Sequence, residues 1–226
     1  MLYGVFFAAV SLLCAVYAFN PGGVSMLLLW PSASFMTVAV AYFTRNGFIF
    51  GKRRDGRLGA FRVIVLLPFL LTIWLMWHIL RALRPEPPCH EVAPGLFLGR
   101  LPLPGEVPEE VRVIVDMTAE HYEHAEVMKG REYILIPTLD GSAPGTDHFV
   151  AAMRHVLPAG GAMLVHCAEG YGRSAMCAAV IMVLKGAAKN IEEAEEIMRR
   201  SRSRVAIRSS QSECARKAIR ALAEGL

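Results

Sequence analysis

Acidic residues are nearly absent from the first 84 residues of this 226-residue chain, where Asp55 is the only one and stands among eight Lys or Arg. Residues 85–226 hold sixteen basic and nineteen acidic side chains, so the net charge of +4 averages two unlike parts. A basic excess between apolar runs is typical of membrane orientation signals. We therefore expect a membrane domain at 1–84, and no nucleic-acid partner.

Paired cysteine motifs are lacking as well. The five cysteines include no CxxC pair and no Cys/His cluster, which argues against a zinc site and against a disulfide framework. We expect no metal and no cofactor. Cys177 and Cys214 are expected to be packed thiols, although the sequence leaves a redox role for either of them open.

Charged side chains are missing from three long apolar runs, at residues 2–19, 24–43 and 63–80. A helix of about twenty apolar residues crosses a bilayer core, so the sequence predicts three transmembrane helices and a multi-pass protein. Trp74 and Trp77, near the end of the third run, are expected in a headgroup belt.

The region after the membrane part alternates between strand and helix patterns. A Pro-rich linker is predicted at 85–91 and a soluble domain at 92–226. Residues 92–99 are predicted to be a strand entry with a turn, and strands are predicted at 111–117, 133–139 and 162–167. The predicted helices include 146–157, 174–185 and two that Asn190 and Ser210 begin as N-caps. This pattern favours an α/β fold with a mainly parallel sheet flanked by helices.

The chemistry is concentrated in residues 165–175, Val-His-Cys-Ala-Glu-Gly-Tyr-Gly-Arg-Ser-Ala. A buried strand ends at Cys167, and a helix begins near Arg173. Glycines in the loop between them let successive N–H groups point to one centre, and the helix N-terminus adds further donors. We expect phosphate to bind to Arg173 and to the loop residues Ala168, Glu169, Gly170, Tyr171 and Gly172.

The segment His-Cys-Ala-Glu-Gly-Tyr-Gly-Arg-Ser resembles the His-Cys-x5-Arg-Ser/Thr signature of the cysteine-dependent tyrosine and dual-specificity phosphatases. The resemblance covers roughly residues 90–224, none of the membrane segments, and suggests a membrane-anchored member of bacterial type. It implies that Cys167 forms a phosphocysteine, that Arg173 holds the phosphate, and that Ser174 hydrogen-bonds the leaving sulfur. His166 would support the loop, or would simply be packed in the core.

The resemblance also implies a carboxylic acid upstream of the cysteine. Asp140 follows a predicted strand and lies in a loop with Gly141, Pro144 and Gly145. It is therefore preferred to Asp116, which falls within or just after a buried strand, and to Asp147, which opens a helix.

The substrate is expected to be a phosphoprotein or a phospholipid. The compact domain resembles a dual-specificity or tyrosine protein phosphatase, and this is the first hypothesis. The short tether to the bilayer supports the alternative, a lipid-phosphate phosphatase of phosphatidylglycerophosphate or phosphoinositide type. Glu169 disfavours a polyphosphorylated headgroup. An inactive phosphate-binding module and a sulfur-transfer or arsenate-reducing enzyme fit less well, because the catalytic set is intact.

Orientation and oligomeric state stay open. The segment after the second apolar run is basic, with Arg45, Lys52, Arg53, Arg54, Arg57 and Arg62. The positive-inside rule places it in the cytoplasm, and a third crossing would then carry the soluble domain outside. An oxidising exterior is a poor compartment for a reactive thiolate.

Overall fold

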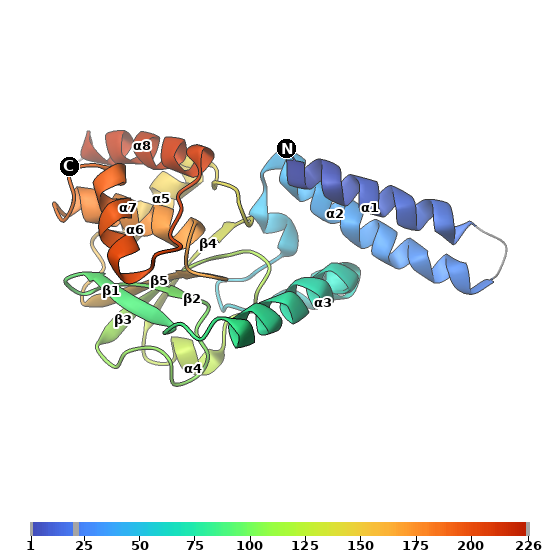
Figure 1. Cartoon of the computed structure of the whole chain (residues 1–226), viewed down its shortest axis with the longest axis horizontal. Coiled ribbons are helices and arrows are strands. Elements are labelled where there is room, and N and C mark those ends of the chain that lie inside the picture. Colours follow the sequence, from blue (N-terminus) through green and yellow to red (C-terminus); the bar gives the residue numbers. More distant parts are fainter. Residues whose placement is uncertain (1, 20–22, 225–226) are drawn as a thin grey trace.

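The computed structural model describes residues 2–19 and 23–224, and it divides into a helical hairpin and a sheet-and-helix domain joined by a long helix (Figure 1). The hairpin consists of α1 (Leu2–Ala18) and α2 (Leu29–Thr44), the latter preceded by the 3₁₀ helix η1 (Gly23–Leu28). Ser11 Oγ donates to the Ser32 carbonyl across the two helices at 2.8 Å. The segment Asn20-Pro21-Gly22-Gly23 between the first two apolar runs has the composition of a turn, and it lies largely outside the described residues.

The third apolar run forms the helix α3 (Ala60–Leu83). Phe69 of α3 packs edge-on against Phe7 of α1 and Phe35 of α2, with ring centroids 5.4 and 6.2 Å apart. Two helical stretches, Ser25–Thr44 and Ala60–Leu83, are long and apolar enough to cross a membrane, while α1 is shorter. All three apolar runs are therefore helical, and among the described residues α1, with 17 residues, lies at the lower end of the range of about 17–25 residues that can span a bilayer.

The soluble domain is built on a five-stranded sheet with the order β1-β2-β5-β3-β4. Every neighbouring pair is parallel except β1 with β2, which confirms the expected mainly parallel sheet. β1 begins at Cys89, inside the predicted 85–91 linker. The strands are β1 (Cys89–Ala93), β2 (Leu96–Arg100), β3 (Val111–Thr118), β4 (Glu132–Thr138) and β5 (Ala162–Cys167).

Helices cover both faces of the sheet (Figure 1). On one face, α6 is buried along nearly its whole length and packs against α7 and α8. On the other face, Val127 of the short helix α4 packs against Ile114 and Leu164. The helices are α4 (Ala125–Met128), α5 (Thr146–Val156), α6 (Arg173–Leu184), α7 (Ile191–Ser201) and α8 (Ser209–Ala223).

The two predicted N-caps have different outcomes. The Asn190 side chain accepts the Glu193 N–H at 2.9 Å and caps α7 as expected. Ser210 does not cap α8, because that helix already begins at Ser209. Instead, Gln211 Oε1 accepts the Arg208 N–H at 3.0 Å, so the glutamine side chain pairs with the backbone N–H of the residue just before α8.

The basic loop between α2 and α3, residues 45–59, is inserted into the soluble domain. It contains the 3₁₀ helix η2 (Gly47–Phe50), where a side chain on Gly47 would collide with the Pro137 carbonyl. The Lys52 ammonium contacts the Asp116 carboxylate and lies 2.7 Å from Thr118 Oγ1, and the Lys52 and Asp116 side chains are fully buried. This loop is therefore part of the soluble domain's core.

Helix α3 also contacts the soluble domain, through two indoles. Trp74 Nε1 donates to the Glu120 carbonyl at 3.2 Å, and Trp77 Nε1 donates to the Ala168 carbonyl at 3.1 Å. Both indole N–H groups thus bind protein carbonyls, and their place in a headgroup belt stays a prediction. The loop and the helix together attach the apolar helices to the sheet domain.

Lys52→Met tests this attachment, because it leaves the buried Asp116 carboxylate without its cation. We expect the free energy of unfolding to fall by about 3–5 kcal/mol, measured by denaturant titration of the detergent-solubilised chain. Arg54→Met, which removes an exposed cation from the same loop, is the matched control and is expected to change stability by less than about 0.5 kcal/mol. Equal stability of the two variants would contradict the structural role of Lys52.

Candidate active site

The site lies where three parallel strands end. Cys167 ends β5, Glu120 follows β3 by two residues and Asp140 follows β4 by two residues. Carboxyl ends of parallel strands meet at the same edge of a sheet, which is where α/β proteins place their ligands. The fold therefore brings together residues that are far apart in the sequence.

The phosphate loop, residues 167–173, wraps around the Cys167 sulfur. Sγ accepts hydrogen bonds from the Gly170 N–H at 3.2 Å and from Ser174 Oγ at 3.3 Å. Gly170 has a φ of +81°, and a Cβ there would lie 2.6 Å from the Gly99 carbonyl, so only glycine fits. Burial raises the pKa of the Cys167 thiol, but Arg173 and these hydrogen bonds outweigh it and leave the pKa lowered. The sulfur is set up as a thiolate.

Arg173 is the first residue of α6 and its side chain is buried beside the sulfur. Its guanidinium donates to the two carboxylate oxygens of Glu120 at 3.0 and 2.8 Å and to the Thr138 carbonyl at 2.8 Å. Burial raises the pKa of Glu120, yet the charge of Arg173 lowers it overall, so the carboxylate is ionised. The arginine fork is therefore locked in one orientation.

Sequence reasoning missed Glu120. The signal that could have found it is its place just after the buried strand β3, at the same sheet edge as Cys167 and Asp140. Glu120 lies in a polar stretch with Glu123 and Glu126. The sequence alone does not indicate which of these three acids faces the site.

Asp140 lies at the mouth of the site, and its role as the acid stays a prediction. Its Oδ1 is 3.2 Å from Arg173 Nη2, and 70% of its side chain is exposed. Tyr42 of α2 donates to the Asp140 backbone carbonyl at 3.2 Å, so the helical hairpin contacts the loop that bears this acid. Of its two competitors, Asp116 is bound to Lys52, and Asp147 lies in the first turn of α5.

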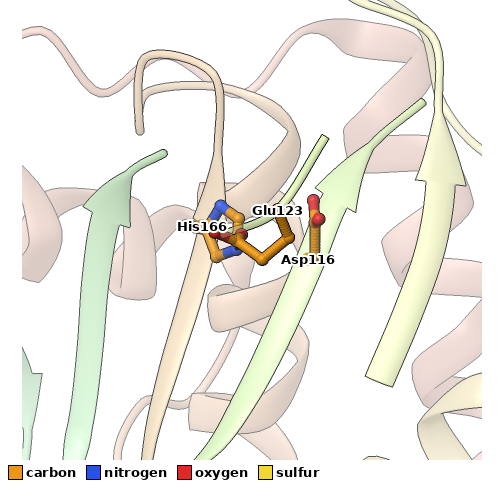
Figure 2. A group of neighbouring side chains, drawn as sticks. All are labelled: Asp116, Glu123 and His166. Atoms are coloured by element: carbon orange, nitrogen blue, oxygen red, sulfur yellow. The ribbon is translucent and has the colours of Figure 1, made fainter. Parts of the chain in front are cut away.

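His166 lies behind the loop in a buried charged group with Asp116 and Glu123 (Figure 2). Its Nε2 is 3.0 Å from Glu123 Oε2, and neither side chain is exposed. Burial lowers the pKa of His166, but Asp116 and Glu123 raise it overall. One acceptor or imidazole atom from each residue would suit a metal ion, but Lys52 already supplies a positive charge to Asp116. That His166 supports the loop stays a prediction.

The outward side chains of the loop are paired with the segment after α3. Glu169 Oε2 accepts from Arg84 Nη1 at 3.0 Å, and the Tyr171 hydroxyl donates to Glu86 at 2.7 Å. The Glu169 carboxylate is therefore engaged outside the bowl that would hold a phosphate. The loop amides of Ala168, Glu169, Gly170, Tyr171 and Gly172 remain the predicted phosphate ligands.

A cavity of about 220 Å³ opens onto Arg173 and Asp140. Glu120, His121 and Glu169 also line this charged end.

The opposite walls of the cavity come from α1, α2 and α3 and are apolar or aromatic. They are Tyr3, Phe7, Tyr42, Phe69, Ile73, Met76, Trp77 and Leu80. The cavity is thus charged on the side of the catalytic residues and apolar on the side of the three helices.

Cys177 and Cys214 do not share the environment of Cys167. Burial alone raises the pKa of the Cys177 thiol to about 12, and Cys177 Sγ contacts Met153. Burial also raises the pKa of Cys214, which contacts the Pro144 carbonyl. Both are packed thiols, as expected.

Comparison with known proteins agrees with this geometry. A family model described as a polymorphic toxin system DSP-PTPase phosphatase matches residues 107–187. The solved structure of PTPMT1 is 26% identical with a TM-score of 0.50, covering 61% of this chain and 99% of that one. A variant of human DUSP28 is 24% identical with a TM-score of 0.51, covering 62% and 100%. No curated protein sequence matches the chain.

The fold, the thiolate in its amide-lined loop and the fixed arginine define a cysteine-dependent phosphatase domain. Residues 107–187 match the phosphatase model and the fold is shared with PTPMT1 and human DUSP28, so these comparisons support the superfamily of cysteine-dependent tyrosine and dual-specificity phosphatases.

The lowered pKa of Cys167 can be measured by its rate of alkylation with iodoacetamide. Because the thiolate is the reactive form, the rate should rise with pH through a midpoint below the free-thiol value of about 8.5. Ser174→Ala removes a hydrogen bond that favours the thiolate, so the midpoint should move to higher pH. An unchanged midpoint in this variant would show that Ser174 does not stabilise the sulfur.

Proposed function

We propose that this protein hydrolyses phosphate monoesters of membrane lipids in two steps, through a phosphocysteine on Cys167. The observation that carries the lipid assignment is the cavity, which has Arg173 and Asp140 at one end and apolar or aromatic side chains of α1, α2 and α3 at the other.

The residues supply a complete reaction. The Cys167 thiolate attacks phosphorus, the P–O ester bond breaks, and protonated Asp140 gives its proton to the departing oxygen. Arg173 and the loop amides stabilise the charge on the equatorial oxygens. Water then attacks the phosphocysteine, Asp140 accepts its proton, and inorganic phosphate leaves as the thiolate re-forms. Ser174 stabilises that departing sulfur.

The size of the cavity indicates how a lipid would lie. Binding pockets that enclose a whole small molecule measure about 300–1,000 Å³, so a cavity of about 220 Å³ holds the phosphate and the first atoms attached to it. The rest of the substrate must extend along α1–α3. Their exposed side chains, such as Phe6, Leu71 and Leu75, are apolar, which suits acyl chains rather than a peptide backbone.

A phosphoprotein is the second candidate, favoured by the protein-phosphatase type of some neighbours. Solved structures similar in fold include PTPMT1 in complex with PI(5)P and human DUSP28, so the comparisons are compatible with both substrate classes. Against a phosphoprotein, Trp77 of α3 is bonded directly to the phosphate loop. A folded partner would have to approach between apolar helices.

Asp140→Asn tests the acid assignment. The variant should lose about 10²–10⁴-fold in kcat on an alkyl phosphate, whose leaving group needs a proton, and far less on 4-nitrophenyl phosphate. Cys167→Ser should remove turnover of both substrates. An equal loss on the two substrates in Asp140→Asn would move the acid to another residue.

Ile73→Trp tests the lipid assignment by filling the apolar part of the cavity. For dioleoyl phosphatidate in mixed micelles, kcat/KM should fall by about tenfold or more, while activity on 4-nitrophenyl phosphate should be retained. Leu75→Trp, on the exposed face of the same helix, is the matched control. A wild-type chain that hydrolyses phosphotyrosine peptides readily and phosphatidate no faster than Cys167→Ser would establish the phosphoprotein reading instead.

A further inference from the structure

We infer that α3 does not cross the bilayer: it lies along the membrane-facing side of the phosphatase domain, both of its ends stay on that side, and only the α1–α2 hairpin crosses. This topology replaces the three crossings expected from hydropathy with two.

The first observation concerns the chain that leads into α3. The Gly56 carbonyl accepts the Glu123 N–H at 2.8 Å, three residues before the helix reaches its N-cap at Gly59. A side chain on Gly56 would lie 2.8 Å from the Glu123 Cβ, so the two segments are in tight contact. Together with the buried Lys52–Asp116 pair, this fixes the start of α3 to the phosphatase domain.

The second observation concerns the end of α3. The Arg81 guanidinium donates to the Leu101 carbonyl at 3.1 Å and forms an ion pair with Glu106. The chain then enters β1 at Cys89. The end of α3 is therefore attached to the same domain as its start.

These attachments are incompatible with a crossing. The hydrocarbon core of a bilayer is about 30 Å thick. The two ends of a spanning helix therefore lie in water on opposite sides of the bilayer, where one soluble domain cannot contact both. The middle of α3 also contacts the domain, through Trp74 and Trp77. A helix held at its start, middle and end by one soluble domain runs alongside that domain.

The outward face of α3 identifies what covers it. Large apolar side chains are exposed along its whole length, with Phe61 and Leu83 each 72% exposed at opposite ends, and most are separated by three, four or seven residues, as on one face of a helix. They are Phe61, Ile64, Leu71, Leu75, Met76, Ile79 and Leu83, while Arg62, Thr72 and His78 are the exposed polar residues of this helix. This stripe is continuous with the apolar hairpin, against which Phe69 packs, so its occupant is the acyl region of one leaflet.

The topology also fixes the side of the phosphatase domain. Arg53, Arg54 and Arg57 of the basic loop are exposed beside the domain, so loop and domain share a compartment. The positive-inside rule places that compartment in the cytoplasm, where thiols stay reduced. The positive-inside rule and the need of the Cys167 thiolate for a reducing compartment then both place the phosphatase domain in the cytoplasm.

Sidedness of single cysteines tests the crossing. In a chain whose native cysteines are all replaced, including Cys167→Ser, single cysteines are placed at Arg54, Lys189 and Leu27. With a membrane-impermeant maleimide on intact cells, we expect Leu27→Cys, near the far end of the hairpin, to react, and Arg54→Cys and Lys189→Cys to react only after lysis. Resistance of the phosphatase domain to limited proteolysis confirms folding of each variant.

Two results of this experiment would overturn the inference. If Arg54→Cys and Lys189→Cys react from opposite sides, α3 crosses the bilayer. If all three positions react from one side, the hairpin does not cross.

Lipid contact is tested separately. A bimane label at Leu75→Cys should be quenched by lipids with brominated acyl chains in reconstituted vesicles, whereas the same label at Lys189→Cys should not. Absence of quenching at Leu75, with a cross-linked dimer through that position instead, would assign the stripe to a second copy of the chain and overturn the lipid assignment.

Discussion

The buried ion pair between Arg173 and Glu120 is the interaction on which the site depends. A guanidinium removed from water is stable only where its charge and its donors are matched, and two carboxylate oxygens with one backbone carbonyl achieve this. The same pairing fixes the plane of the fork before any phosphate arrives, so binding does not have to order a long flexible side chain. It also positions the charge that lowers the pKa of Cys167.

A second buried charge group stands behind the first. His166, adjacent in sequence to the nucleophile, pairs with Glu123, while Asp116 pairs with Lys52. The cation of the second pair, Lys52, comes from the loop between α2 and α3, so this loop contributes to the surroundings of the catalytic loop. With Trp77 bonded to Ala168 and Tyr42 to Asp140, α2 and α3 form part of the site.

Local patterns were enough to predict the elements and the nucleophile loop. The strands ending at Thr118, Thr138 and Cys167 were readable because buried parallel strands are continuous apolar runs, and the glycines and Arg173 fall at offsets that only an anion cradle needs. Glu120, Lys52 and the two indoles could not be found this way, because their partners lie 46 or more residues away in the sequence. Hydropathy likewise indicates that α3 has apolar surroundings, but it does not indicate how this helix is oriented.

The contacts between the phosphate loop and the segment after α3 determine what a proteolytic cut in that segment would do. Arg84 donates to Glu169, Tyr171 donates to Glu86, and Trp77 donates to the Ala168 carbonyl. A cut after Glu86 that released the downstream fragment would therefore remove all three partners from the phosphate loop at once. The released fragment would keep Cys167 and Arg173 but would lose the contacts that hold the outer side of the loop.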